Sequence, residues 1–205
     1  VIGAAAVCGF GAAGLRISGR HPGDPWPSVD GDAFAFRKIR EAAAAKRVRV
    51  SSISGYYLTS QTRIEHLLAN VRAARECGAP LIAQGCFDPD PARVRRLMRQ
   101  YAKAADEAAL KIALEFMPMS ELKTLEQASD VSASSGANVG ILIDALHLAR
   151  SGAGAAEVAA LAPASILLTQ LCDAPAQLAP GSTLFNEAMS GRMYLGDGGL
   201  DLAGL

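Results

Sequence analysis

Short runs of branched aliphatic residues alternate along the chain with longer alanine-rich runs that carry Arg, Lys and Glu at helical spacing. The short runs are apolar on both faces and predict parallel strands covered by helices. The longer runs predict amphipathic helices. Strands are expected at Ala13–Ser18, Arg47–Ser52, Pro80–Gly85, Lys111–Phe116, Asn138–Asp144 and Ser165–Leu171. Helices are expected at Val1–Gly9, Asp32–Lys46, Gln61–Cys77, Pro91–Ala108, Leu122–Ser135 and Ala155–Leu161.

Local signals mark several of the expected helix ends. Asp90 is placed to cap a helix whose first turn contains Pro91. Ser120 is placed to cap the helix that follows it. Gly78 and Gly136 stand where helices are expected to end, because glycine tolerates positive φ.

The strand centres recur at intervals of roughly 25–35 residues, the length of one β-α unit. Alternation of strands and helices implies a parallel α/β fold, either a closed barrel or an open doubly wound sheet. No G-x-G-x-x-G loop follows a strand, and polar residues recur at the carboxyl ends of successive strands, which favours the barrel. These polar residues are Arg16, Gln84, Glu115, Asp144 and Gln170.

The number of strands falls short of a full barrel. Six are expected in this chain, whereas a (β/α)8 TIM barrel has eight strands and about 250 residues. We therefore expect residues 1–205 to form one barrel domain that is incomplete at both ends, with its first and last strands outside this chain.

Composition narrows the classes of function. Lys+Arg and Asp+Glu both total 20, so there is no basic surplus to bind nucleic acid. No apolar run reaches the roughly 20 residues that a membrane span requires. The four cysteines lie far apart with no C-x-x-C pair, which indicates buried, reduced thiols. A cytoplasmic protein that acts on a small molecule is expected, and association into a homo-oligomer stays open.

Glu115 is the second-to-last residue of the expected strand Lys111–Phe116. Strand alternation places Ala113 and Glu115 on one face, and the larger Ile112, Leu114 and Phe116 on the other. The face with the smaller residues is expected to point to the barrel axis. A carboxylate there must be protonated, bound to metal or, as the alternative reading, paired with a basic group.

Three further side chains follow strand ends. Asp144 closes an apolar strand and is predicted to be a metal ligand, and His147 is predicted to contact substrate. The carbonyl oxygen of Gln170 can ligate a hard cation, although an amide hydrogen-bonded across the barrel is an alternative. Asp173 is expected to organise the loop that follows it.

This oxygen-rich set suits Mn²⁺ or Mg²⁺, with Co²⁺ or Zn²⁺ as alternatives. A divalent ion beside a carboxylate base suits proton transfer at the carbon next to a carbonyl. Arg192 and Arg16 are further candidates for holding substrate oxygens, while a solvated loop is the alternative for Arg192. Arg20 and His21 lie in a proline-containing loop after the first strand that either covers a site or forms a surface turn.

The sequence resembles the sugar phosphate isomerase/epimerase superfamily, the xylose isomerase-like barrels that include ketose 3-epimerases, inosose isomerases and dehydratases, and endonuclease IV-type enzymes. The resemblance covers almost all of the chain. It is carried by Leu114-Glu-Phe, Asn138-Val-Gly-Ile-Leu-Ile-Asp-Ala-Leu-His, Gln170-Leu-Cys-Asp and Gly196-Asp-Gly-Gly-Leu-Asp.

This resemblance implies a (β/α)8 barrel that binds a divalent metal. Glu115 and Asp144 match the first two family ligands, and His147 matches a residue that often touches substrate. Gln170 stands where many members carry a ligand His, and the final Glu ligand of the family has no counterpart before Leu205. Glu115 and His147 are thus the expected catalytic residues, and Glu115, Asp144 and Gln170 the expected ligands.

The expected function is metal-dependent isomerisation or epimerisation of a sugar, a sugar phosphate, a cyclitol or a related hydroxy-ketone. A dehydratase acting at the same site is one alternative, because proton removal next to a carbonyl can be followed by loss of water. A degenerate barrel that binds a ligand without catalysis is another. A DNA repair endonuclease is disfavoured by the neutral charge and the few histidines.

Overall fold

Six parallel strands form one curved sheet in the computed structural model, which describes residues 1–204. The strands are β1 (Ala12–Arg16), β2 (Arg49–Ser54), β3 (Leu81–Gln84), β4 (Lys111–Glu115), β5 (Val139–Asp144) and β6 (Ile166–Gln170). All six predicted strands are confirmed, with ends shifted by a few residues. Because each strand pairs with its neighbours in sequence, the order is that of a TIM barrel and lacks the reversal of a doubly wound sheet.

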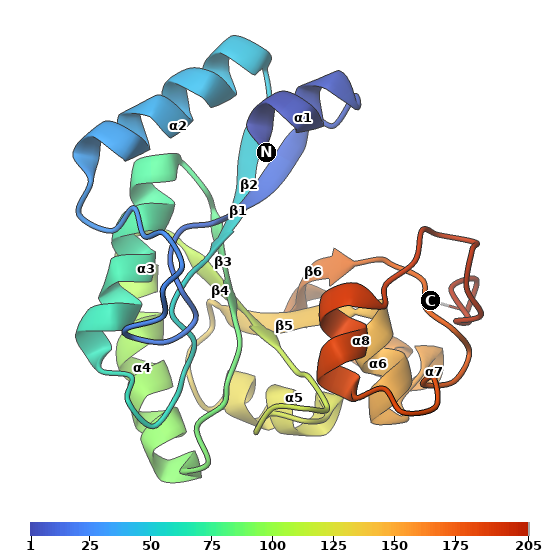
Figure 1. Ribbon diagram of the computed structural model, residues 1–205. Helices are drawn as coiled ribbons and strands as arrows, with labels where there is room; N and C mark the ends of the chain where they lie inside the picture. Colours follow the sequence, from blue (N-terminus) through green and yellow to red (C-terminus); the bar gives the residue numbers. More distant parts are fainter. Residues whose placement is uncertain (205) are drawn as a thin grey trace.

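The described sheet is an incomplete barrel, with β1 and β6 at its two edges. Helices α2, α3 and α4 lie side by side along its outer face. Helices α6, α7 and α8 lie together beside β5 and β6, at the other edge of the sheet from α2 (Figure 1). The helices are α1 (Ile2–Val7), α2 (Ala33–Lys46), α3 (Ile64–Cys77), α4 (Pro91–Glu107), α5 (Leu125–Ala133), α6 (Ala145–Ser151), α7 (Ala155–Ala159), α8 (Leu184–Ser190) and the short 3-10 turn η1 (Pro163–Ser165). Helices α6 and α8 were not predicted from the sequence.

The two faces of the sheet bury different sets of apolar residues. Ile112 and Leu114 belong to the large cluster between the strands and the outer helices, and both are fully buried. Ala113 belongs to a small cluster inside the barrel, with Leu81 and Leu142. The predicted facing of β4 is therefore confirmed. Burial of an aliphatic side chain such as Ile112 contributes roughly 2 kcal/mol to folding.

Two of the four predicted helix-end signals are confirmed. The Asp90 side chain caps α4, and Gly78 ends α3 with a φ of +69°. The other two were wrong. Thr124 caps α5, because Ser120 uses its hydroxyl within the preceding turn. Helix α5 also ends before Gly136, without a left-handed residue.

Two further expectations concern the burial of the cysteines and the absence of a membrane-spanning segment. All four cysteines are free, and Cys77 and Cys86 are buried, as predicted. Cys8 is exposed and Cys172 is half-buried, so the prediction of burial was wrong for these two. Among the described residues, no helix is both long and apolar enough to cross a membrane.

Candidate metal centre at the strand ends

Glu115 is the last residue of β4 and points into the mouth of the barrel. Its side chain is 12% exposed, and its Oε1 atom lies 3.8 Å from Nε2 of His147. Burial, and after it the nearby charge of Asp144, raises the pKa of Glu115 to about 7, against the opposing charges of Arg192 and Arg20. Glu115 can therefore gain or lose a proton near neutral pH.

Asp144 is both the last residue of β5 and the N-cap of α6. Its Oδ1 atom accepts hydrogen bonds from the backbone N–H groups of Leu146 at 3.0 Å and His147 at 3.1 Å. Its Oδ2 atom accepts a hydrogen bond from Nη1 of Arg192 at 2.9 Å. Because the strand passes directly into the helix, Asp144 fixes the position of the His147 backbone.

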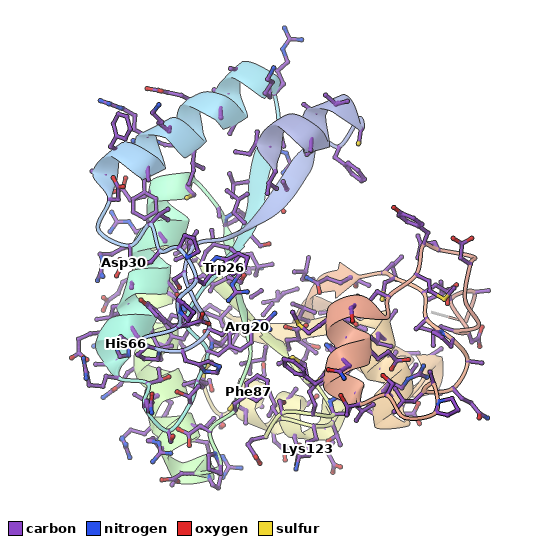
Figure 2. All side chains as sticks on the ribbon, viewed as in Figure 1. Arg20, Trp26, Asp30, His66, Phe87 and Lys123 are labelled. Atoms are coloured by element: carbon purple, nitrogen blue, oxygen red, sulfur yellow. The ribbon has the colours of Figure 1, made fainter. Side chains whose placement is uncertain are left out.

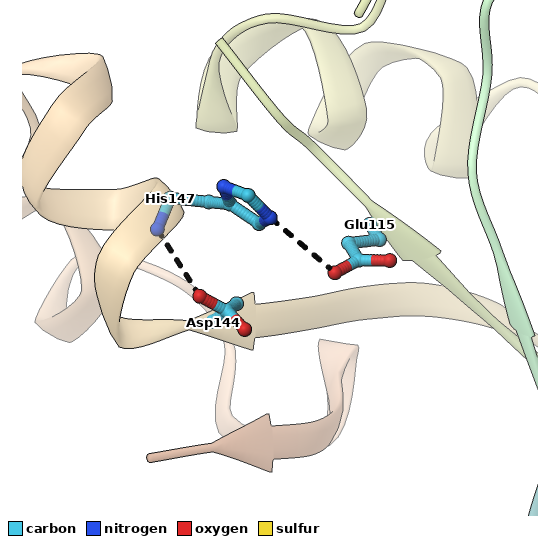
Figure 3. Close-up of side chains that lie close together, drawn as sticks. All are labelled: Glu115, Asp144 and His147. Carbon is cyan, nitrogen blue, oxygen red and sulfur yellow. Dashed lines mark hydrogen bonds and ion pairs between the residues drawn. The ribbon is translucent and has the colours of Figure 1, made fainter. Parts of the chain in front are cut away.

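His147 is buried, with its ring directed from α6 toward Glu115 (Figure 3). Burial lowers the pKa of His147, and the charges of Arg192 and Arg20 lower it further, while the charge of Asp144 raises it. The imidazole is therefore neutral at physiological pH. A neutral imidazole has a free ring nitrogen that can accept a proton or bind a metal.

The three side chains converge in a way that fits a divalent cation. One ligand atom from each of Glu115, Asp144 and His147 lies within 4.8 Å of the other two. Two carboxylates at this separation repel each other in a site of low exposure, and a cation between them would remove that cost. Carboxylates and imidazole are ligands that first-row divalent metals accept.

The structure thus brings together Glu115 and Asp144, as expected, and adds His147 as a third potential ligand. Gln170 pairs with Asp144 in the β5–β6 register and is exposed on the edge strand. Its role as a ligand stays a prediction.

Arg192 reaches the same site from the loop after α8. Beyond its bond to Asp144, its Nη2 atom lies 3.5 Å from Nε2 of His147. Its Nε atom donates to the carbonyl oxygen of Ala188 at 2.9 Å, which anchors the guanidinium. Its predicted contact with substrate remains untested, but its side chain does lie at the site.

Asp173 organises the loop that carries Arg192 toward the site, as expected. Its carboxylate accepts hydrogen bonds from the backbone N–H groups of Gly196 at 3.0 Å and Leu200 at 3.1 Å. These bonds lower the pKa of Asp173, with the Leu200 bond as the largest cause. The Gly196-Asp-Gly-Gly-Leu-Asp segment therefore has a structural role next to the site.

Arg16 lies at the end of β1, but its guanidinium already has partners in the loop that follows. Nη2 of Arg16 lies 3.6 Å from Oδ2 of Asp24, and its Cζ lies 4.1 Å from the centre of the Trp26 ring. Its Nε atom donates to the carbonyl oxygen of Ser18 at 3.0 Å. The structure does not place Arg16 with the three converging side chains, so its contact with substrate stays a prediction.

Two further residues lie near the mouth of the barrel: Arg20, from the loop expected either to cover a site or to form a surface turn, and Tyr57, which the sequence analysis did not single out. The Arg20 guanidinium lies over the ring of Tyr57, with Cζ 5.3 Å from the ring centre. Burial, and after it the charge of Glu115, raises the pKa of Tyr57 to about 12, so this phenol is within electrostatic range of the site. Both residues follow strand ends closely, which is the signal that could have identified them.

Comparison with known proteins gives one family match. A family model described as a xylose isomerase-like TIM barrel matches residues 2–205. No curated protein sequence matches the chain.

Similar solved structures share the fold at low sequence identity. A fusion protein of a xylose isomerase-like TIM barrel and a 4-hydroxyphenylpyruvate dioxygenase matches 99% of this chain and 33% of its own, with a TM-score of 0.78 and 16% identity. The IolI protein, crystallised with a zinc atom, matches 98% and 74%, with a TM-score of 0.77 and 16% identity. An L-ribulose 3-epimerase matches 97% and 66%, with a TM-score of 0.69 and 17% identity. The chain therefore spans about a third of the first relative and about three quarters of the second.

Proposed function

Because this chain belongs to the xylose isomerase-like TIM barrel family, we propose that it carries the site of a metal-dependent isomerase or epimerase acting on a sugar, a sugar phosphate or a cyclitol. The observation that carries this proposal is the convergence of Glu115, Asp144 and His147 at the carboxyl ends of the strands. In barrels of this kind, chemistry takes place at that end. The epimerase among the similar structures supports the reaction class.

Glu115, Asp144 and His147 would hold the metal, with Gln170 as a proposed fourth ligand from the next strand. When bound, a divalent ion supplies a Lewis acid that polarises a substrate carbonyl. The carboxylate-rich set favours Mn²⁺ or Mg²⁺, and the zinc bound by the IolI protein keeps Zn²⁺ among the alternatives, along with Co²⁺.

Glu115 is proposed to move the proton. Burial raises the pKa of this carboxyl to about 7 in the metal-free protein, and a bound cation would lower it, so with the metal in place Glu115 would be ionised and able to accept a proton. The carboxylate would take a proton from the carbon next to the substrate carbonyl and return it to the same or the adjacent carbon. Neutral His147 and cationic Arg192 would orient the substrate oxygens, because Nε2 of His147 lies 3.8 Å from Oε1 of Glu115 and Nη1 of Arg192 donates to Oδ2 of Asp144.

Proton exchange into D₂O, followed by NMR on a panel of ketoses with Mn²⁺, tests this function. We expect exchange and turnover that require the metal and fall at least about 100-fold in a Glu115→Gln variant. The matched control is Glu41→Gln, an exposed acid on α2 that pairs with Arg37.

Three results would speak against the proposal. Turnover that does not depend on the metal would exclude the role assigned to the ion, and turnover that survives in Glu115→Gln would exclude the role assigned to Glu115. Release of water in place of epimerisation would assign the site to a dehydratase. Ligand binding without any exchange would indicate a barrel that binds without catalysis.

A further inference from the structure

The guanidinium of Arg20 extends over the mouth of the barrel without an acidic partner. Among residues 1–204, no carboxylate lies within 4.0 Å of it, whereas the neighbouring Arg16 pairs with Asp24. Asp24 binds Arg20 only through the backbone, since its Oδ2 atom accepts from the Arg20 N–H at 3.0 Å. A half-buried, unpaired guanidinium beside a catalytic site has hydrogen-bond donors left for a ligand.

Arg20 is held in place by an aromatic platform rather than by charge. The Tyr57 ring beneath it is buried and stacks on Phe87 with a centroid separation of 6.0 Å. The backbone N–H of Tyr57 also donates to the carbonyl oxygen of Arg20 at 2.8 Å. A guanidinium seated on an aromatic face loses less conformational freedom when it binds an anion.

Arg20 and Arg192 meet at the same end of α8. Nη1 of Arg20 lies 3.7 Å from Sδ of Met189, and Nε of Arg192 is bonded to the adjacent Ala188. Figure 2 shows Arg20 on the side of the β1–α2 loop that faces α8. Two cationic side chains from opposite edges of the sheet therefore contact neighbouring residues at the end of α8.

The charges that surround Glu115 favour an anionic ligand. The carboxylates of Glu115 and Asp144 are balanced in number by the guanidinium groups of Arg20 and Arg192. A divalent ion at Glu115, Asp144 and His147 would leave two positive charges without a counterpart. A neutral sugar cannot neutralise them, but a substrate with a carboxylate or a phosphate group can.

We propose that Arg20 determines specificity by binding a carboxylate or phosphate group of the substrate while the hydroxy-ketone part lies at Glu115 and His147. This inference rests on the proposed function and narrows its substrate to anionic compounds. Arg guanidinium groups bind both kinds of anion through two parallel hydrogen bonds, so the chemistry at Arg20 is shared by the two classes.

Titration calorimetry of the full chain with Mn²⁺ tests the inference with matched probes. D-fructose 6-phosphate and D-fructose form the phosphate arm, and hydroxypyruvate and hydroxyacetone form the carboxylate arm. We expect at least one anionic probe to bind about 10- to 100-fold more tightly than its neutral match, as expected for a hydrogen bond to a charged group. An Arg20→Gln variant should lose this preference and leave the affinity for the neutral probe unchanged.

Two more variants keep the result interpretable. Arg49→Gln removes an exposed arginine at the opposite end of the strands and should keep the full preference. Arg20→Lys retains the positive charge but lacks the planar guanidinium that can form two parallel hydrogen bonds, so this variant should keep only part of the preference for the anionic probe. If wild-type protein shows no preference for either anion, or if Arg20→Gln or Arg20→Lys binds the anion as wild-type protein does, the inference is overturned.

The Glu115→Gln variant separates this inference from the proposed function. Arg20 is intact in that variant and one opposing negative charge is removed, so without metal the variant should bind inorganic phosphate at least as tightly as wild-type protein, although turnover is lost. A wild-type chain that shows an Arg20-dependent preference for anions but no turnover would contradict the proposed function alone. Turnover of neutral and anionic ketoses at equal efficiency, unaffected by Arg20→Gln, would contradict the inference alone.

Discussion

Replacement of Glu115 by Gln should stabilise the metal-free protein at alkaline pH. The pKa of Glu115 is raised from 4.5 to about 7 in the folded protein, chiefly by burial and also by the charge of Asp144. Between these two pH values the folded protein holds a proton that the unfolded chain releases. Stability from this group is therefore complete below about pH 4.5 and is lost as the pH rises toward about 7.

The shift of about 2.5 pKa units corresponds to about 3 kcal/mol, since each unit represents about 1.4 kcal/mol. Ionisation of Glu115 therefore lowers the free energy of unfolding of the wild-type protein by about 3 kcal/mol at about pH 8, and by less than about 1 kcal/mol at about pH 5. A glutamine of the same shape cannot ionise, so the variant avoids the cost at every pH. The side chain is 12% exposed, so little solvent is present to screen the effect.

Urea unfolding in EDTA at about pH 5 and about pH 8 measures this difference. We expect Glu115→Gln to exceed wild-type protein by about 3 kcal/mol at the higher pH and by about 1 kcal/mol or less at the lower one. Glu41→Gln, at an exposed position, should show no such pH-dependent gain. A gain that is the same at both pH values, or a loss at about pH 8, would refute the reasoning that burial penalises this carboxylate.

Two other substitutions test neighbouring parts of the structure. Arg192→Gln should bind Mn²⁺ about 10-fold more tightly in calorimetry. In the wild-type protein Nη1 of Arg192 donates to Oδ2 of Asp144 at 2.9 Å and adds a positive charge beside the ion. Equal or weaker binding by the variant would show that the guanidinium does not compete with Mn²⁺ for Asp144. Gly140→Ala should lower the free energy of unfolding by about 1–3 kcal/mol, because a Cβ there would overlap the Ser165 carbonyl oxygen and lie 2.6 Å from Cγ of Leu167. Gly3→Ala, with nothing within 4 Å of its Cβ, is the control, and equal stability of the two variants in urea would contradict this packing argument.

The sequence by itself determined the strands and the direction of the residues on them. Parallel strands buried on both faces appear as apolar runs, and alternation along such a run is a local property of the backbone. The facing of Ala113 toward the barrel interior and of Ile112 toward the helices could therefore be predicted. The position of Glu115 and Asp144 at neighbouring strand ends followed from the same pattern.

Helix α6 shows where local patterns were insufficient. It begins directly after β5, with Asp144 as both the strand end and the cap, and no loop separates the two elements. The strand was predicted to end at Asp144, but the 7-residue helix that follows is too short to give a helical pattern, so the turn toward Glu115 was not predicted. That turn is what makes His147 a potential ligand as well as a substrate contact.

Only the tertiary structure decided which arginines lie at the site. Arg16 and Arg20 are four residues apart near the same strand end, yet Arg16 turns to Asp24 and Trp26 while Arg20 lies over Tyr57 near α8. Arg192 reaches Asp144 across 48 residues of sequence. Strand periodicity is set by neighbouring peptide units, but the partner of a long side chain in a loop depends on how distant segments pack, and no local pattern encodes that.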